Sequence, residues 1–264
     1  MHKLSIVCLL IFFQSISFSQ PTVYTTANAH SHNDYEKPEP FTAAYIRQFG
    51  SIEADIFLKD DELYVAHTDD QLAQKRTLDA FYLKPLAALI KKNKGFAYAD
   101  KKRQLQLMID IKTEAVSTLH KLIEQIKKYP SLISCPTLKI VISGNRPAPS
   151  AFADLPGFIH FDAQFTIEYP ETALKKVEMY SDNFKNYSAW NGLGNIPEKD
   201  SIAIAAAVAK AHALHKTVRF WNAPDTPEAW NFFMNAGVDY INTDHITEIT
   251  EYLNNRQTAG RKKT

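Results

Sequence analysis

The stretch that most constrains the fold covers residues 51–58 and reads Ser-Ile-Glu53-Ala-Asp55-Ile-Phe-Leu. A short apolar run of this kind predicts a β-strand, along which side chains alternate with a period of two. Glu53 and Asp55 therefore point to the same side. Like charges held a few ångströms apart cost free energy unless a cation or a shared proton relieves them. We predict a buried strand with two ligands for a hard cation; the alternative is an edge strand with both acids in solvent.

Two apolar runs that end in histidines flank this stretch. The first ends at His30 and His32, and the second reads Leu-Tyr-Val-Ala-His67. Imidazoles that transfer protons, beside oxygen ligands for a cation, are what metal-assisted hydrolysis requires. The alternative for each is a structural histidine whose hydrogen bonds are satisfied within the core.

Strand-like and helix-like segments alternate after residue 26, which is typical of a parallel α/β protein. The predicted strands cover residues 27–32, 52–58, 105–112, 138–143, 158–163, 217–221 and 240–243, with a weaker run at 179–184. The predicted helices cover residues 41–49, 78–92, 114–128, 171–178, 201–215 and 227–235. Residues 63–67 follow the second strand too closely for a crossover helix, so we expect a short hairpin there. About eight strands predict one (β/α)8 TIM barrel. A doubly wound sheet is the fallback, but no glycine-rich phosphate turn follows the first strand.

Polar residues gather where the predicted strands end, which is the active-site rim of such barrels. Asp110 and Lys112 end the strand at 105–112, and Asn242 and Asp244 lie at the end of the last strand. Asp110 is therefore a third candidate metal ligand. A buried ion pair with Lys112 is the alternative explanation for this acid.

The overall composition argues against a nucleic-acid partner. The 264 residues include 30 Lys and Arg and 29 Asp and Glu, for a formal net charge of +1, and no basic stripe is present to neutralise phosphates. One domain over residues 20–256 is expected to fold as a monomer, followed by a disordered basic tail at 257–264.

The N-terminus has the pattern of a secretory signal peptide. Lys3 precedes an apolar run over residues 4–13, and the small residues Ser17 and Ser19 suit cleavage before Gln20. We therefore expect residues 1–19 to be a signal peptide, and the protein to be periplasmic or extracellular, with no transmembrane span in the mature chain. Cys135 would then be the one remaining cysteine, which excludes an intramolecular disulfide.

The order of these motifs carries a family resemblance. His30, then Ile-Glu53-Ala-Asp55, then Val-Ala-His67 resembles the glycerophosphodiester phosphodiesterase family and the wider group of barrels like phosphatidylinositol-specific phospholipase C. Residues 218–222 and 236–244 look like the last two strands of that family. The segment around Asp110 is similar to the third-strand motif of the sphingomyelinase D branch.

The resemblance implies a metal-dependent phosphoric diester hydrolase that acts on a small-molecule or lipid-headgroup diester. It implies that His30 and His67 are the acid/base pair. It also implies one divalent cation, Ca²⁺ or Mg²⁺, held by Glu53, Asp55 and Asp110. The substrate-binding residues would be Lys112, which meets the phosphate, and His32, Asn33 and Trp221.

The sequence departs from the family pattern in two places. The usual His-Arg-Gly after the first strand is here His30-Ser31-His32, which removes a phosphate-facing arginine. The third metal ligand is often Glu, and Asp110 is shorter by one methylene.

Two other functions compete with this prediction. In a zinc amidohydrolase-like barrel, His30 and His32 would form the opening metal pair, Asp244 would be the last-strand acid and His160 a further ligand. That function leaves Glu53 and Asp55 unexplained. The third possibility is a barrel that binds lipid or sugar headgroups without catalysis.

Overall fold

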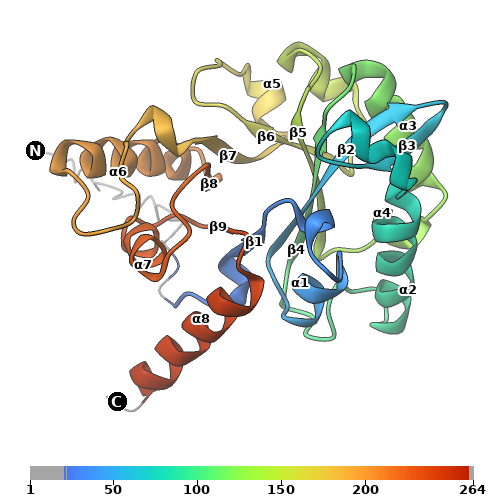
Figure 1. Ribbon diagram of the computed structural model, residues 1–264. Coiled ribbons are helices and arrows are strands. Elements are labelled where there is room, and N and C mark those ends of the chain that lie inside the picture. The colour runs from blue at the N-terminus through green and yellow to red at the C-terminus, as the bar shows by residue number, and fades with distance from the viewer. Residues whose placement is uncertain (1–20, 22, 262–264) are drawn as a thin grey trace, which may run out of the picture.

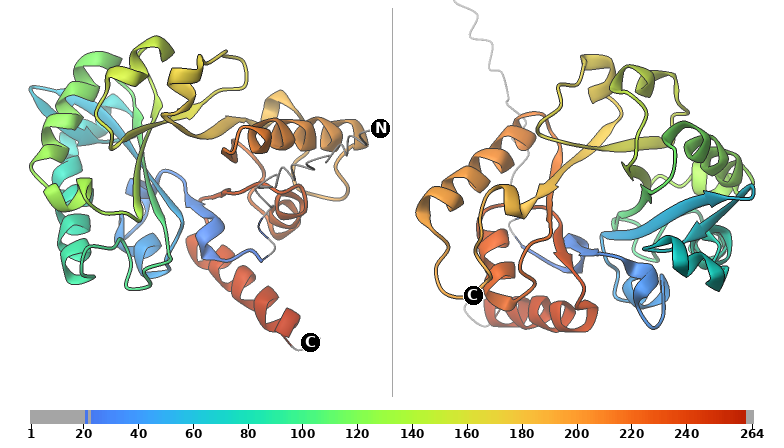
Figure 2. Two further views of the ribbon diagram at one scale, coloured as in Figure 1. Left: turned by 180° about the vertical axis from the view of Figure 1, so that it is seen from behind. Right: turned by 45° about the horizontal axis from the view of Figure 1, so that its top comes forward.

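The structure is a computed structural model that describes residues 21 and 23–261 (Figure 1). The predicted signal peptide at 1–19 and residues 262–264 of the predicted tail lie outside the described residues. Eight parallel strands form one sheet that curls into a nearly closed barrel with helices outside it (Figure 2). The predicted (β/α)8 barrel is thereby confirmed.

The strands follow the predicted segments closely. They are β1 (Ala29–Ser31), β2 (Ser51–Lys59), β3 (Glu62–Val65), β4 (Leu105–Ile111), β5 (Leu138–Gly144), β6 (Ile159–Ala163), β7 (Val177–Asn183), β8 (Thr217–Trp221) and β9 (Ile241–Thr243). Hydrogen-bonded neighbours run in the order β8-β7-β6-β5-β4-β2-β1-β9. An isolated parallel bridge between Arg219 and Tyr240 joins the two ends. The barrel therefore closes between β8 and β9 through a single bridge rather than a full ladder.

The strand β3 lies outside the parallel series. It pairs antiparallel with β2 through a turn in which Asp60 and Asp61 have φ values of 49° and 62°. Asp tolerates this left-handed conformation better than most residues, because its short polar side chain can hydrogen-bond locally. The predicted hairpin after the second strand is confirmed.

The helices lie outside the sheet, most of them in the connections between strands and the last one after β9 (Figure 1). They are α1 (Thr42–Ile46), α2 (Lys84–Lys92), α3 (Ala115–Lys127), α4 (Pro130–Ile133), α5 (Glu171–Leu174), α6 (Glu198–Ala213), α7 (Pro227–Asn235) and α8 (Ile246–Arg261). Shorter 3₁₀ or π turns cover Thr26–Asn28, Asp34–Glu36, Asp69–Gln74, Asp79–Leu83, Pro149–Asp154 and Phe184–Asn186. The start of α7 is as predicted: Pro227 opens the helix, and the Thr226 hydroxyl accepts from the Ala229 N–H.

Several segments differ from the predicted helices. Only Thr42–Ile46 of the helix expected at 41–49 is helical, and α4 was not predicted. The helix expected at 171–178 ends at Leu174, and Val177 already belongs to β7, because pairing with β6 and β8 draws this apolar run into the sheet. No helix was predicted after residue 243, yet α8 continues to Arg261. Residues 257–261 of the expected disordered tail are therefore helical.

A small apolar cluster inside the barrel separates the polar rim from the opposite end. It consists of Met108, Val141 and Met179, with Tyr240 packed against them. Each of the first three lies two residues before a polar residue of the rim on its own strand, and so on the same face. The polar residues therefore gather at the carboxyl ends of the strands. Among the described residues, no helix has the length and apolar character needed to cross a membrane.

Candidate active site

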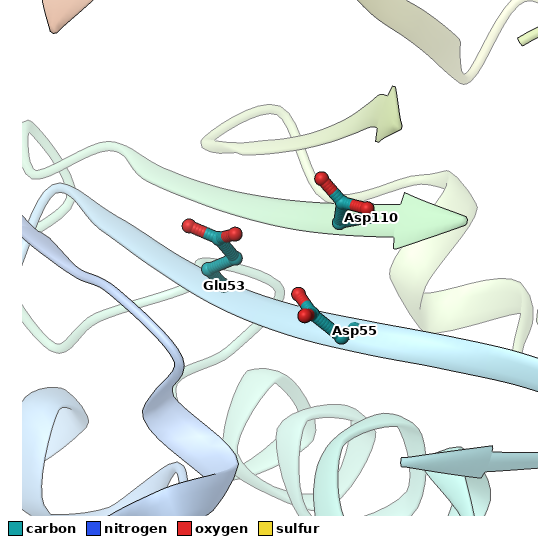
Figure 3. A group of neighbouring side chains, drawn as sticks. All are labelled: Glu53, Asp55 and Asp110. Atoms are coloured by element: carbon teal, nitrogen blue, oxygen red, sulfur yellow. The ribbon is translucent and has the colours of Figure 1, made fainter. Parts of the chain in front are cut away.

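Three carboxylates converge from the first half of β2 and the carboxyl end of β4. The parallel register places Asp55 directly opposite Asp110, while Glu53 precedes Asp55 by two residues on the same face. One oxygen from each of the three lies within 4.8 Å of the others. Figure 3 shows the side chains of Glu53 and Asp55 on the same side of β2, with Asp110 across from them on β4. The sequence prediction that these three acids lie together is consistent with this geometry.

The crowding of these acids changes their protonation. Burial, together with the charges of Glu53 and Asp110, raises the pKa of Asp55 to about 7, although Lys112 opposes the rise. Burial and the Glu53 charge also raise the pKa of Asp110. The Oδ1 atom of Asp55 is buried and has no hydrogen-bond partner. Crowded carboxylates with an unpartnered buried oxygen fit a hard divalent cation, which prefers oxygen ligands.

Lys112 lies between two of the acids. Its Nζ is 2.9 Å from Asp55 Oδ2 and 2.9 Å from Asp110 Oδ1. The ion pair considered as the alternative explanation for Asp110 is therefore present. It exists together with the three-acid cluster rather than in place of it.

His30 is fully buried within β1 and is held by β2. Its Nδ1 lies 2.7 Å from Ser51 Oγ, and its Nε2 lies 2.6 Å from Glu53 Oε2. Burial first, and then the Arg219 guanidinium, lowers the pKa of His30 to about 4. The imidazole is therefore neutral near pH 7.

His67 lies on the other side of the acids, just after β3. Its side chain is 50% exposed, and its Nδ1 lies 3.2 Å from the Tyr35 hydroxyl and 3.7 Å from Asp55 Oδ2. The Tyr35 hydroxyl donates to Asp55 Oδ2 at 2.8 Å. Tyr35, which the sequence analysis did not select, therefore contacts both an acid and a histidine of the site.

Arg219 is the main residue that the sequence analysis missed. It points inward from β8 with only 3% of its side chain exposed, and its Nη1 lies 2.7 Å from Glu53 Oε2 and 2.6 Å from His30 Nε2. Burial raises the pKa of Glu53, but Arg219 and the His30 hydrogen bond outweigh it and hold that pKa well below its ordinary value. A charged residue in the middle of the apolar run Val218-Arg-Phe220 was the available signal.

A second missed group lies on the opposite wall, on β5, β6 and β7. Asp162 is buried and accepts hydrogen bonds from the hydroxyls of Ser143, at 2.9 Å, and Ser181. The single acid within Ile159–Ala163 gave no spacing pattern from which a site could be inferred.

The remaining predicted substrate residues lie around a pocket of about 300 Å³. His32, Asn33, His67, Lys112 and Trp221 line it, as do Glu53 and Asp110. The deeper His30 and Asp55 are not among its lining residues.

Two of the lining residues have defined local roles. His32 Nδ1 lies 3.2 Å from Asp244 Oδ1, which also accepts from Lys37 at 2.7 Å. Asn33 adopts a φ of 44°, so it turns the chain after β1, as expected for an Asn at such a position.

The zinc alternative does not fit this geometry. His30 contacts Glu53 inside the barrel, whereas His32 pairs with Asp244 at the rim. His160 lies 3.7 Å from Glu178 and does not approach either of them. Within the described part of the chain, the one cluster of three or more possible metal-ligating side chains is the acidic one.

Comparisons with known proteins agree with the fold and motifs. A family model described as "AIM6-like phosphodiesterase domain" matches residues 22–131, and another described as "Glycerophosphoryl diester phosphodiesterase family" matches residues 217–247. The first match contains both predicted catalytic histidines and all three acids, and the second contains Arg219. These matches support the superfamily of glycerophosphodiester phosphodiesterase and phospholipase C-like proteins that the sequence motifs predicted.

Individual relatives are distant. Altered inheritance of mitochondria protein 6 of Kluyveromyces lactis is 24% identical over 85% of this chain and 72% of its own length. The homolog of that protein in Arthroderma benhamiae is 26% identical over 85% of this chain and 83% of its own length. The prediction of a periplasmic or extracellular protein is contradicted by these relatives, which are fungal proteins named for the inheritance of mitochondria and are not exported bacterial proteins.

Two solved structures share the fold. A glycerophosphodiester phosphodiesterase from Parabacteroides distasonis aligns with a TM-score of 0.55 at 16% identity, over 87% of this chain and 96% of its own. A calcium-dependent phosphoinositol-specific phospholipase C from Pseudomonas sp. aligns with a TM-score of 0.54 at 12% identity, over 85% of this chain and 91% of its own.

Proposed function

We propose that the chain is a phosphoric diester hydrolase that requires one divalent cation and uses His30 and His67 as its acid/base pair. The observation that carries this proposal is the cluster of three carboxylates, two of them buried and Asp110 partly buried, with a histidine beside it on each side. The substrate would be a small-molecule or lipid-headgroup phosphodiester, as the phosphodiesterase family matches suggest.

The cation would be held by Glu53, Asp55 and Asp110. Their oxygens converge, and Asp55 Oδ1 has no other partner. A set of ligands made only of oxygen favours Ca²⁺ or Mg²⁺ over Zn²⁺. When bound, such an ion supplies positive charge that stabilises the negative charge developing on the phosphoryl oxygens.

Lys112 and His67, which line the pocket, and the deeper His30 would supply the remaining chemistry. Lys112 lines the pocket and places an ammonium group where it can neutralise a non-bridging phosphate oxygen. His30 is neutral near pH 7, the state in which an imidazole accepts the proton of an attacking hydroxyl. His67 is half exposed and lines the pocket, so it can protonate the leaving alkoxide as the phosphorus–oxygen bond breaks.

Phosphorus NMR with a panel of diesters tests this function. We expect turnover that is lost with a chelator and restored by Ca²⁺ or Mg²⁺, and the products distinguish a cyclic phosphate from a hydrolysed one. The His30→Ala and His67→Ala variants should each lose about 10²- to 10⁴-fold in rate, the usual contribution of general acid/base catalysis. His120→Ala is the matched control, because His120 is exposed on α3, away from the pocket.

Two results would contradict the proposal. Near-normal activity of folded His30→Ala and His67→Ala variants refutes the acid/base assignment. Absence of turnover with every diester, together with headgroup binding that a chelator does not affect, favours the non-catalytic barrel.

A further inference from the structure

A groove of about 650 Å³ opens beside the catalytic pocket on the same rim of the barrel. Its walls come from the segments that follow β4, β5 and β6, and the last two lie side by side in both views of Figure 2. Lys112, Gly144, Arg146 and Gln164 line both the groove and the catalytic pocket. The two spaces are therefore continuous, and one ligand can occupy both.

Most polar side chains of the groove already have partners within the chain. The Glu114 carboxylate caps α3 by accepting the N–H groups of Val116 and Ser117 at 2.9 and 2.7 Å. Intramolecular hydrogen bonds or ion pairs also engage Lys112, Thr113, Asn145, Arg146 and Tyr169. Gln164, the remaining polar side chain, is exposed at the junction with the catalytic pocket. The groups with unused hydrogen-bonding capacity include Gln164 and the further N–H donors of Arg146, and both residues lie at the junction with the catalytic pocket rather than at the outer wall.

The outer wall of the groove is apolar and preformed. It is lined by Pro147, Ala148, Pro149, Phe152 and Ile167. Ile167 is 39% exposed, whereas Phe152 is buried and stacks on Phe161 with ring centroids 3.5 Å apart. Proline fixes its own φ angle, so this wall needs little ordering when a ligand binds.

We propose that the groove binds the apolar tail of a single-chain phosphodiester whose phosphate lies in the catalytic pocket. This inference rests on the proposed function and adds a substrate class to it: diesters that carry one alkyl or acyl chain. Gly144 lies at the passage between the two spaces and has no side chain to narrow it.

The test compares glycerophosphocholine with its 1-acyl derivatives that carry chains of six, eight and ten carbons, each kept below its critical micelle concentration. All four compounds keep the glycerol hydroxyl next to the phosphodiester, so they differ in the tail and not in the possible nucleophile. Burying one methylene contributes about 0.8 kcal/mol, and 1.4 kcal/mol corresponds to a factor of ten. Each pair of added methylenes that enters the groove should therefore raise kcat/KM by up to about tenfold. Equal kcat/KM for all four compounds overturns the proposal.

A matched pair of tryptophan variants tests whether the dependence of kcat/KM on chain length arises in the groove. Ala148→Trp fills the apolar wall, whereas Ala153→Trp places the same side chain at an exposed alanine of the same loop, outside the groove. The ratio of kcat/KM for the ten-carbon compound to that for glycerophosphocholine should fall toward one in Ala148→Trp. It should remain high in Ala153→Trp, and an equal fall in both variants contradicts the assignment.

A binding measurement separates failure of the groove from failure of the proposed function. Calorimetry with the ten-carbon compound in the presence of a chelator needs no turnover. If no diester is hydrolysed, binding that Ala148→Trp weakens and Ala153→Trp does not still supports the groove. Binding that is absent, or that is equal in wild type and both variants, refutes it.

Discussion

Replacement of Asp55 by Asn is expected to stabilise the metal-free protein while it removes a cation ligand. Asp55 is fully buried, and its pKa rises from an ordinary 3.8 to about 7. Its Oδ2 accepts from Lys112 at 2.9 Å and from Tyr35 at 2.8 Å, and the carbonyl oxygen of Asn can keep both contacts. The amide group would then stand at the unpartnered Oδ1 position, facing the other acids.

The magnitude follows from the difference between the folded and unfolded pKa values. Between about pH 4 and pH 7 the folded state holds a proton on Asp55 that the unfolded state has released, so the free energy of unfolding falls as the pH rises through this window. At 1.36 kcal/mol for each pH unit, the loss reaches about 4 kcal/mol above pH 7. Asn does not titrate and avoids this loss.

Urea unfolding with a chelator present measures the effect. Asp55→Asn should exceed wild type by up to about 4 kcal/mol at pH 8 and differ little from it near pH 4. Adding Ca²⁺ or Mg²⁺ at one hundred times its dissociation constant should stabilise wild type by about 2.7 kcal/mol, and the variant by less. Asp70 is an exposed acid outside the site, so Asp70→Asn should change neither the free energy of unfolding nor the stabilisation by the cation. An Asp55→Asn variant that is no more stable than wild type at pH 8 refutes the reasoning.

Two further substitutions test the surroundings of the acids. Arg219→Met leaves Glu53 buried without its cationic partner. The free energy of unfolding, measured with urea in the presence of a chelator, should therefore fall by about 3–5 kcal/mol. A bound divalent cation should restore part of this loss. An unchanged free energy of unfolding would show that the pair contributes no net stability. Gly144→Ala adds a Cβ that clashes with Asp110 Oδ1 at a residue whose φ is 68°, so calorimetry should show about 10- to 100-fold weaker cation binding. Gly157→Ala, where a Cβ would meet nothing within 4 Å, is the control, and equal affinities in both variants would contradict this account.

Local patterns predicted most of the strands because short apolar runs are typical of the strands of a buried parallel sheet. The β8 strand begins and ends as predicted, and the hairpin after β2 follows from a spacing too short for a helix. The boundary between α5 and β7 was wrong because residues 171–178 fit a helix locally. Only the ladder to β6, in which Val177 lies opposite Phe161, makes Val177 part of a strand.

The sequence by itself determined that Glu53 and Asp55 share a face, because alternation along a strand is a local property. Tertiary structure decided what faces them. Parallel pairing of β2 with β4 brought Asp110 opposite Asp55, and curling of the sheet brought Arg219 to Glu53 across 166 positions of sequence. Contacts between residues so far apart in the sequence depend on strand order and register, which no local pattern encodes.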